Sequence, residues 1–363
     1  MRDFIPQMEP WFGSEEKEAL SKYMDEGGWI TEFKKTFEFQ DLIKDFTGAK
    51  HCFAVNNGTI SLSIMAMAAG IKAGDEVLIP NYTMVATPNS VKMFGAKPKF
   101  TDVDSKSLCI SLDEIEKHTT SKTKAVFLMN ANGRYPIDIN EIIAFCKHNN
   151  LILFEDSAQA LGSFYKDGIH QGRKGIAGSF SFSAPKIIST GQGGAIVTDD
   201  DEIADNISKL KDFGRSGGGN DVHERIGFNF KFTDVQAVIG IAQMGKLNWR
   251  VKRMKEIYAR YKKNLSENEK IEFFDQDLEN TTPWFIDLKV ENREELMDFL
   301  MLNKIGSRVM YPPLNKQRAY NLKGEHKISN EIGIKGLWLP SSSKLSNDQI
   351  DYICETINKF YQN

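Results

Sequence analysis

Between residues 51 and 200, short and mainly apolar runs alternate with longer segments that have the apolar spacing of helices. We predict a strand in each of seven such runs: HCFAV (51–55), GDEVLIP (74–80), KPKFTDVD (97–104), AVFLMNA (125–131), LILFED (151–156), GSFSFS (178–183) and GAIVTDD (194–200). Strands and helices that alternate along a chain are typical of parallel sheets. The pattern therefore predicts an α/β fold, with a mostly parallel seven-stranded sheet and helices on both of its faces.

The pattern changes after about residue 245. Residues 246–265 form one long, strongly charged helical segment, and a predicted strand (284–290) and helix (293–304) follow it. A chain of 363 residues, of which 41% are hydrophobic, can bury more than one core. We therefore predict a large domain over residues 1–250, which begins with an N-terminal arm, and a smaller C-terminal α/β domain over residues 251–363.

Charge and cysteine content argue against several classes of protein. The net charge is −3 without long runs of one sign, so neither nucleic acid nor a membrane surface is an expected partner. No apolar run approaches the roughly 20 residues that cross a bilayer, and MRDFIPQMEPWFG lacks the apolar core of a signal peptide. The four cysteines stand apart, which argues against disulfides and against a metal site. We expect a cytoplasmic protein.

Polar groups collect where predicted strands end, which is where open α/β sheets bind their ligands. NNGT (56–59) has a glycine and a hydroxyl at a helix start, which suits a phosphate group, although plain turns share this composition. FEDSAQA (154–160) places Asp156 and Gln159 after a buried strand. An acid at this position either serves a ligand or caps the following segment.

Lys186 stands alone among small, apolar and glycine residues in SFSAPKIISTGQGG (181–194). Apolar burial lowers the pKa of an amine from about 10.4, and a neutral amine forms Schiff bases with carbonyl groups. The alternative is a lysine at a strand edge that pairs with a carboxylate. A phosphate-binding turn, a strand-end aspartate and a buried lysine together match the needs of pyridoxal 5′-phosphate (PLP).

Six long motifs follow one another in the order of a known family. They lie at residues 33–59, 73–91, 95–104, 154–163, 179–200 and 226–248. Through them, and over about residues 5–355, the chain resembles the DegT/DnrJ/EryC1/StrS family of PLP-dependent sugar aminotransferases, which have the aspartate aminotransferase fold of type I. The resemblance implies an enzyme that uses PLP to transfer an amino group to a sugar.

The resemblance assigns three residues to the chemistry. Lys186 matches the lysine that is linked covalently to PLP and moves the proton during the reaction. Asp156 matches the acid that pairs with the protonated ring nitrogen, and Gln159 matches the residue that hydrogen-bonds the 3-oxygen of the ring.

The resemblance also implies a phosphate site that two subunits share. Gly58, Thr59 and Ser181 match the residues that surround the phosphate group. Asn229 matches an asparagine that reaches this group from the neighbouring subunit. We therefore expect a homodimer with shared active sites.

The chain departs from the family pattern at several positions. Met84 stands where an aromatic residue commonly stacks on the PLP ring, and Tyr82 is a candidate to compensate for it. NANGR (130–134) replaces the usual HxYG, which makes Asn132 and Arg134 candidates for substrate contacts.

Near the C-terminus, Asn315 stands where a histidine is frequent. Arg308 and Tyr311 are nearby candidates for sugar or phosphate contacts. The segments RSGGG (215–219) and HERIGFNF (223–230) are candidates for a mobile loop over the entrance to the site, although plain connectors share their composition.

The leading prediction for the reaction is transamination from an amino acid, most often glutamate in this family, to a keto- or aldehyde-sugar. The favoured acceptor is a nucleotide-linked 4-keto-6-deoxyhexose of the perosamine type, made for surface polysaccharides such as lipopolysaccharide. The alternative acceptor is the free sugar acid that yields 8-amino-3,8-dideoxy-octulosonate. Because Lys186 is present, a PLP-dependent sugar dehydratase and a non-catalytic PLP-binding regulator are less favoured.

Overall fold

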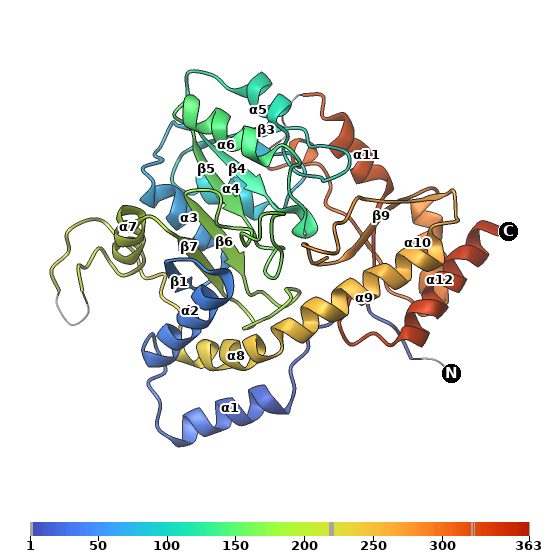
Figure 1. The fold of residues 1–363 in the computed structure, drawn as a ribbon, viewed down its shortest axis with the longest axis horizontal. Coiled ribbons are helices and arrows are strands. Elements are labelled where there is room, and N and C mark those ends of the chain that lie inside the picture. The colour runs from blue at the N-terminus through green and yellow to red at the C-terminus, as the bar shows by residue number, and fades with distance from the viewer. Residues whose placement is uncertain (1–2, 218–220, 321, 323, 363) are drawn as a thin grey trace.

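The computed structural model describes residues 3–217, 221–320, 322 and 324–362, and this part of the chain forms two β-sheets (Figure 1). The larger sheet has seven strands in the order β1-β7-β6-β5-β4-β2-β3. Their bounds are β1 His51–Val55, β2 Glu76–Pro80, β3 Lys97–Thr101, β4 Thr123–Met129, β5 Ile152–Asp156, β6 Ala177–Ser181 and β7 Gly194–Thr198. Strands β3, β2, β4, β5 and β6 are parallel, whereas β7 is antiparallel to β6 and β1. The prediction of a mostly parallel seven-stranded sheet is confirmed.

Strand β7 runs against its neighbours because only residues 182–193, without a helix, join it to β6. A parallel neighbour needs a longer crossover, which is usually a helix. Backbone hydrogen bonds join the two ends of this connection: the N–H of Phe182 donates to Gly193 O (2.8 Å), and that of Thr190 donates to Phe182 O (3.0 Å). Lys186 lies in this loop, directly beyond the carboxyl end of β6.

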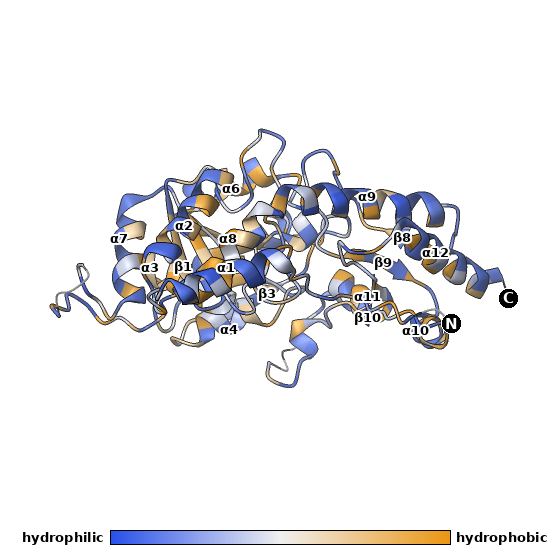
Figure 2. Cartoon of the chain, turned by 90° about the horizontal axis from the view of Figure 1, so that it is seen from below, coloured by the Kyte–Doolittle hydropathy of each residue, from blue (hydrophilic) through white to orange (hydrophobic). Residues whose placement is uncertain are grey.

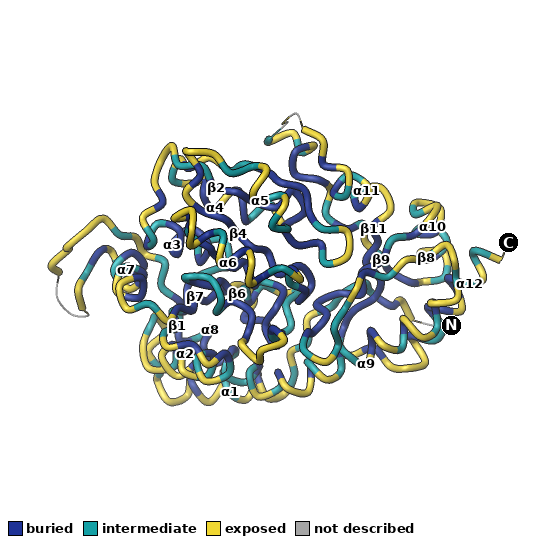
Figure 3. Tube along the Cα trace, turned by 45° about the horizontal axis from the view of Figure 1, so that its top comes forward, coloured by how far each residue is buried: buried dark blue, intermediate teal, exposed yellow. Residues whose placement is uncertain are grey.

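Helices cover both faces of the larger sheet: α2 Lys34–Thr47, α3 Gly58–Ala68, α4 Ala86–Lys92, α5 Leu112–His118, α6 Ile139–His148, α7 Asp201–Lys211 and α8 Asp234–Gly245. Side chains of β4 alternate between the two faces. Phe127 packs with Leu62 of α3 and Ile207 of α7, whereas Val126 packs with Ile142 of α6. The strands are buried and the helices expose their outer sides (Figure 3).

The second sheet is antiparallel, in the order β10-β11-β9-β8. Its strands are β8 Ile271–Phe273, β9 Ile286–Val290, β10 Arg308–Val309 and β11 Gly336–Leu339, and it packs with helices α10 Arg293–Leu302, α11 Lys327–Lys335 and α12 Asn347–Gln362. The predicted strand at 284–290 and helix at 293–304 correspond to β9 and α10.

Helix α9 (Leu247–Leu265) runs from one sheet to the other (Figure 1). Leu247 packs in the apolar cluster of the larger sheet, and Ile257 and Tyr261 pack in that of the smaller sheet. Helices α9 and α12 have hydrophilic outward faces, and hydrophobic residues lie between the two helices (Figure 2). Because residue 250 lies within α9, the predicted domain boundary crosses a continuous helix, and the division into two domains stays a prediction.

The segment before α1 (Ser14–Asp25) also connects the two sheets. Ile5 forms a bridge with Ile305, and the N–H of Ser341 donates to Gln7 O (2.8 Å). Arg250 of α9 donates to Trp11 O (2.8 Å). In the described ranges no helix has the length and apolar character needed to cross a bilayer. Residues 218 and 219 of the predicted mobile loop lie outside these ranges.

Candidate active site

The predicted site residues lie around the carboxyl ends of neighbouring strands. Asp156 ends β5, Ser181 ends β6, and Gly58 begins the helix that follows β1. A cavity is lined by Gln159, Ser181 and Lys186, together with residues of the segments 157–161, 180–187 and 282–284. The fold therefore brings together most of the residues that the sequence analysis assigned to PLP.

The Lys186 side chain ends among buried groups. Its Nζ lies 4.1 Å from the ring centroid of Trp284, and its backbone N–H donates to Ser183 O (3.0 Å). Burial lowers the pKa of the amine to about 8, and the negative charge of Asp156 opposes part of this shift. At neutral pH a fraction of the amine is therefore unprotonated and nucleophilic.

Asp156 is buried and held by two donors. Thr87 Oγ1 donates to Oδ2 (2.7 Å), and the N–H of Ala158 donates to Oδ1 (3.2 Å). Burial raises the pKa of the carboxyl, while the hydrogen bonds from Thr87 and Ala158 and the charge of Lys186 lower it. A carboxylate has about four acceptor positions, so Asp156 can accept from a further N–H donor, such as a protonated ring nitrogen.

Gln159 is oriented by the backbone. The N–H of Asn132 donates to Gln159 Oε1 (2.8 Å). Since this oxygen is engaged, the amide NH₂ group faces the other way, where it bonds the Tyr311 phenol and has a second hydrogen left to donate. Tyr311 lies beside it: burial raises the pKa of this phenol and the Gln159 side chain opposes the rise.

The start of α3 has room and donors for a phosphate group. Asn57 Oδ1 accepts from the N–H of Ile60 (2.9 Å), which leaves the first N–H groups of the helix, those of Gly58 and Thr59, for another acceptor. A Cβ atom at Gly58 would lie 2.9 Å from Ser181 Cβ and 3.1 Å from Ser181 Oγ. The glycine thus leaves a space beside the serine hydroxyl, and the donor set fits the phosphate group of PLP.

The other predicted site residues lie farther out. Met84 is 45% exposed at the start of α4, and its sulfur accepts from the N–H of Ala86 (3.0 Å). Arg308 is exposed, with its guanidinium 5.5 Å from the ring centroid of Trp338. Asn229 is exposed and forms a bridge with Asp212.

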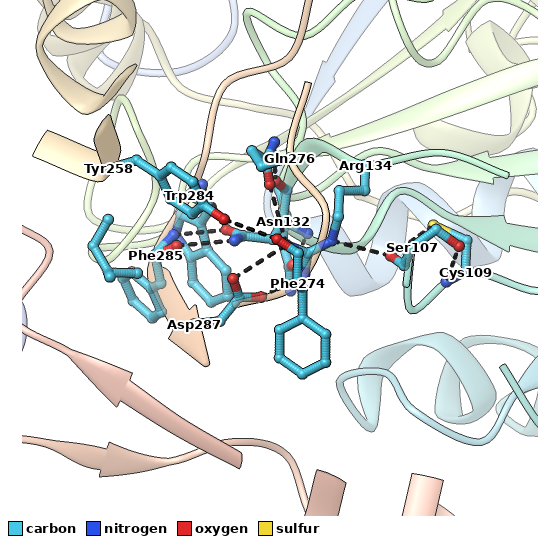
Figure 4. A network of polar contacts seen from close by, with 12 residues as sticks. Ser107, Cys109, Asn132, Arg134, Tyr258, Phe274, Gln276, Trp284, Phe285 and Asp287 are labelled. Atoms are coloured by element: carbon cyan, nitrogen blue, oxygen red, sulfur yellow. Dashed lines mark hydrogen bonds and ion pairs between the residues drawn. The ribbon is translucent and has the colours of Figure 1, made fainter. Parts of the chain in front are cut away.

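Asn132 and Arg134, the predicted candidates for substrate contacts, have polar groups that are engaged within the chain. Both are buried, and their side chains bind other parts of the chain (Figure 4). Arg134 forms an ion pair with Asp287 and donates to Ser107 O (3.1 Å). Asn132 binds the backbone of Trp284 and the residue after it.

The sequence analysis missed Thr87 and Trp284. Thr87 lies within one of the quoted motifs (73–91), where a hydroxyl seven residues after the strand end at Pro80 was a usable signal. Trp284 is the first residue of a predicted strand (284–290) almost 100 residues from Lys186, and no local pattern in the sequence indicates their contact.

Known proteins resemble the chain over nearly its whole length. A sequence model of the DegT/DnrJ/EryC1/StrS aminotransferase family matches residues 11–358. The GDP-perosamine synthase of Escherichia coli O157:H7 is 34% identical, with 99% of each chain covered, and that of Vibrio cholerae is 30% identical, with 98% of this chain and 99% of the relative covered.

Solved structures share the fold. The aminotransferase TlmJ from Streptoalloteichus hindustanus has a TM-score of 0.93 at 27% identity, with 99% of both chains covered. The PLP form of Spr1654 from Streptococcus pneumoniae has a TM-score of 0.91 at 25% identity, also with 99% of both covered.

Proposed function

The chain belongs to the DegT/DnrJ/EryC1/StrS aminotransferase family, and we propose that it transfers an amino group from L-glutamate to a GDP-linked 4-keto-6-deoxyhexose of the perosamine type. It is a PLP-dependent sugar aminotransferase. The choice of acceptor is carried by one observation, the full-length similarity to GDP-perosamine synthases at 34% and 30% identity. Such an aminosugar would serve the synthesis of a surface polysaccharide such as lipopolysaccharide.

We assign the cofactor-binding roles to the residues around the cavity. Lys186 would hold PLP covalently, Asp156 would pair with the ring nitrogen, and Gln159 would donate to the 3-oxygen. Gly58 and Thr59, with Ser181, would bind the phosphate group. Met84, half-exposed at the start of α4, remains a candidate to lie against the ring.

When bound, PLP supplies an electron-withdrawing ring that stabilises negative charge on the carbon losing a proton. Lys186 Nζ takes up this proton and returns it at the other carbon, because its pKa of about 8 lets it act as both base and acid near neutral pH. The negative charge of the Asp156 carboxylate stabilises the protonated form of the group that it pairs with. Thr87 and Ala158 hold its oxygens in place. Tyr311 and Arg308 would contact the sugar.

We also propose that the protein is a homodimer in which both subunits contribute residues to each active site. Trp29 (63%), Phe33 (45%) and Phe37 (53%) are unusually exposed for aromatic residues. Trp29, Phe33 and Phe37 line a cavity that Lys231 also lines, two residues after Asn229. A second copy that covers this face would bury the aromatic rings and bring Asn229 toward the phosphate site of its partner.

The reaction is tested by incubating the purified protein with PLP, glutamate and GDP-4-keto-6-deoxymannose, and measuring the 2-oxoglutarate formed. We expect turnover with this sugar, none with the 8-aldehyde sugar acid, and a loss of several orders of magnitude in Lys186→Ala. Borohydride treatment followed by mass spectrometry should attach the cofactor to Lys186. Turnover with the sugar acid alone would move the assignment to the alternative acceptor.

The shared site is tested by mixing subunits. Lys186→Ala and Asn229→Ala proteins are each expected to be impaired. When they exchange subunits, each mixed dimer contains one site with both residues intact, so activity should reappear. Mixed dimers without any recovery would contradict a site built from two subunits.

A further inference from the structure

The amine of Lys186 and the backbone before it both contact one side chain, Trp284. Nζ lies 4.1 Å from the indole centroid, within the range of a cation–π interaction. The indole Nε1–H donates to the carbonyl oxygen of Pro185 (2.7 Å). Trp284 therefore fixes the loop on one side of the lysine and offers its face to the end of the same lysine.

The indole is itself held in place. It stacks on Phe285 with 3.8 Å between ring centroids, and its edge faces Trp338 at 5.7 Å. Asn132 Oδ1 accepts from the N–H groups of Trp284 (2.6 Å) and Phe285 (2.7 Å), and Asn132 Nδ2 donates to Phe285 O (2.9 Å). These three hydrogen bonds tie the Trp284 backbone to the end of β4 (Figure 4).

The turn that carries Asn132 tolerates little change. Asn132 has a positive φ of 55°, which asparagine adopts more readily than most residues. A Cβ atom at Gly133 would lie 2.4 Å from Thr282 O. Two residues along, Arg134 pairs with Asp287. The turn at 131–134 is thereby locked against the strand that begins after Trp284.

Two opposing effects act on the amine. Burial disfavours its charged form, whereas an aromatic face favours it. The other charged groups around Lys186 are Asp156 on β5, which favours the ammonium, and Arg250 on α9 and Glu9 before α1, which line an adjoining cavity. The indole is the only aromatic ring recorded over Nζ in the described residues.

We propose that Trp284 is a positioning residue, whose indole face holds the Lys186 ammonium whenever the lysine is not linked to the cofactor. Asn132 fixes the indole in that position. The inference rests on the role proposed above for Lys186. It explains why the amine of this half-buried lysine, which must act as base and acid, keeps a defined place when it is free and charged.

The test measures the proton affinity of Lys186 in the protein without PLP. The protein is acetylated with a limiting amount of acetic anhydride between pH 6 and 11, and the modification of the Lys186 peptide is quantified by mass spectrometry. Without the aromatic face, the midpoint should fall by about one pH unit in Trp284→Leu, and by less in Trp284→Phe. Trp249→Leu, which removes a half-exposed tryptophan on α9, should leave the midpoint unchanged.

Unchanged midpoints in both Trp284 variants would overturn the proposal. Should Trp284→Leu fail to fold by circular dichroism, Trp284→Phe decides alone, because it keeps an aromatic ring in the stack. The measurement needs neither PLP nor a sugar. An inactive parent protein with the expected midpoints would therefore count against the proposed function and not against this role of Trp284.

Discussion

The missing side chain of Gly58 leaves the room that the proposed phosphate site needs. The residue begins α3, and its missing side chain leaves room beside Ser181 where phosphate is proposed to bind. An added Cβ would contact Ser181 at 2.9 Å, closer than real Cβ atoms approach other carbons. The close approach of Gly58 to Ser181 therefore leaves no room for an alanine at this position.

We predict that Gly58→Ala weakens PLP binding at least tenfold and also lowers the melting temperature. Alanine displaces Ser181, whose Cβ moves only with its backbone, and the helix propensity of alanine, higher than that of glycine by about 1 kcal/mol, offsets only part of this cost. Absorbance titration with PLP measures the first effect and thermal unfolding without PLP the second. Gly245→Ala is the matched control, since a Cβ there meets nothing within 4 Å. Equal PLP affinity in the two variants would exclude this role of Gly58.

His170 makes the stability of the fold depend on pH. Its Nε2 accepts from the N–H of Gly162 (3.0 Å), so Nδ1 carries the proton and donates to Gln171 O (2.6 Å). Burial lowers the pKa of the imidazole from 6.5 to about 4. The unfolded chain therefore binds a proton at a higher pH than the folded chain does.

We expect the free energy of unfolding to fall as the pH drops from about 6.5 to about 4, and this contribution to level off below that range. The shift corresponds to a total of about 3 kcal/mol. Urea unfolding at pH 7 and pH 5 measures the effect, and His170→Gln should reduce the difference between them. If the free energy of unfolding of His170→Gln differs between pH 7 and pH 5 as much as that of the parent, other groups cause the pH dependence. The control is His148→Gln, at an exposed position.

Among the elements, helix α2 begins without a cap of its own. Its N-cap residue, Phe33, has no side chain that accepts a hydrogen bond, and the carboxylate of Asp234 in α8 caps the helix instead. The carboxylate accepts from the N–H groups of Phe33 (2.8 Å), Lys35 (3.0 Å) and Thr36 (2.9 Å), and from Tyr23 Oη of α1 (2.9 Å). One side chain thus connects three helices.

Asp234→Asn should lower the free energy of unfolding by about 2–3 kcal/mol, because the charge is lost and one oxygen acceptor becomes an NH₂ group. Urea unfolding at pH 7 measures the loss. The control is Asp41→Asn, which removes an exposed carboxylate of α2 and should change the value by less than about 0.5 kcal/mol. A loss as small as that of the control would mean that water replaces the carboxylate.

Local patterns predicted the elements well. The run HCFAV coincides with β1, and the charged segment 246–265 corresponds to α9, because apolar spacing and helix propensity depend on neighbouring residues. The reversed direction of β7 was not predicted, since it follows from how a loop without a helix closes. Likewise, Lys186 was recognised from its immediate surroundings, whereas its contact with Trp284 and the buried partners of Asn132 join segments that are far apart in the sequence.

At the scale of the whole molecule, a buried ion pair joins the two sheets. Arg134 follows the end of β4 and Asp287 lies in β9, and both are nearly inaccessible to water. Gln276 Oε1 also accepts from Arg134 (3.1 Å), and Phe274 lies under the guanidinium at 5.3 Å. The pair fixes the larger sheet against the smaller one beside the active site.

Asp287→Ala should lower the free energy of unfolding by about 3–5 kcal/mol, because Arg134 then stays buried without its counter-charge. The double variant Arg134→Met, Asp287→Leu should lose clearly less, since no charge is left unpaired. Urea unfolding of the parent, of Arg134→Met and Asp287→Leu as single variants, and of the double variant completes the cycle. Additive losses would show that the two side chains are not coupled.

The bridge between Ile5 and Ile305 has a consequence for synthesis on the ribosome. Ile305 is translated about 300 residues after Ile5. At 5–20 residues per second this delay is on the order of 15–60 s. During that interval the nascent chain can assemble the larger sheet but not the smaller one, so the segment around Ile5 has to wait, exposed to chaperones, until its partner has been made.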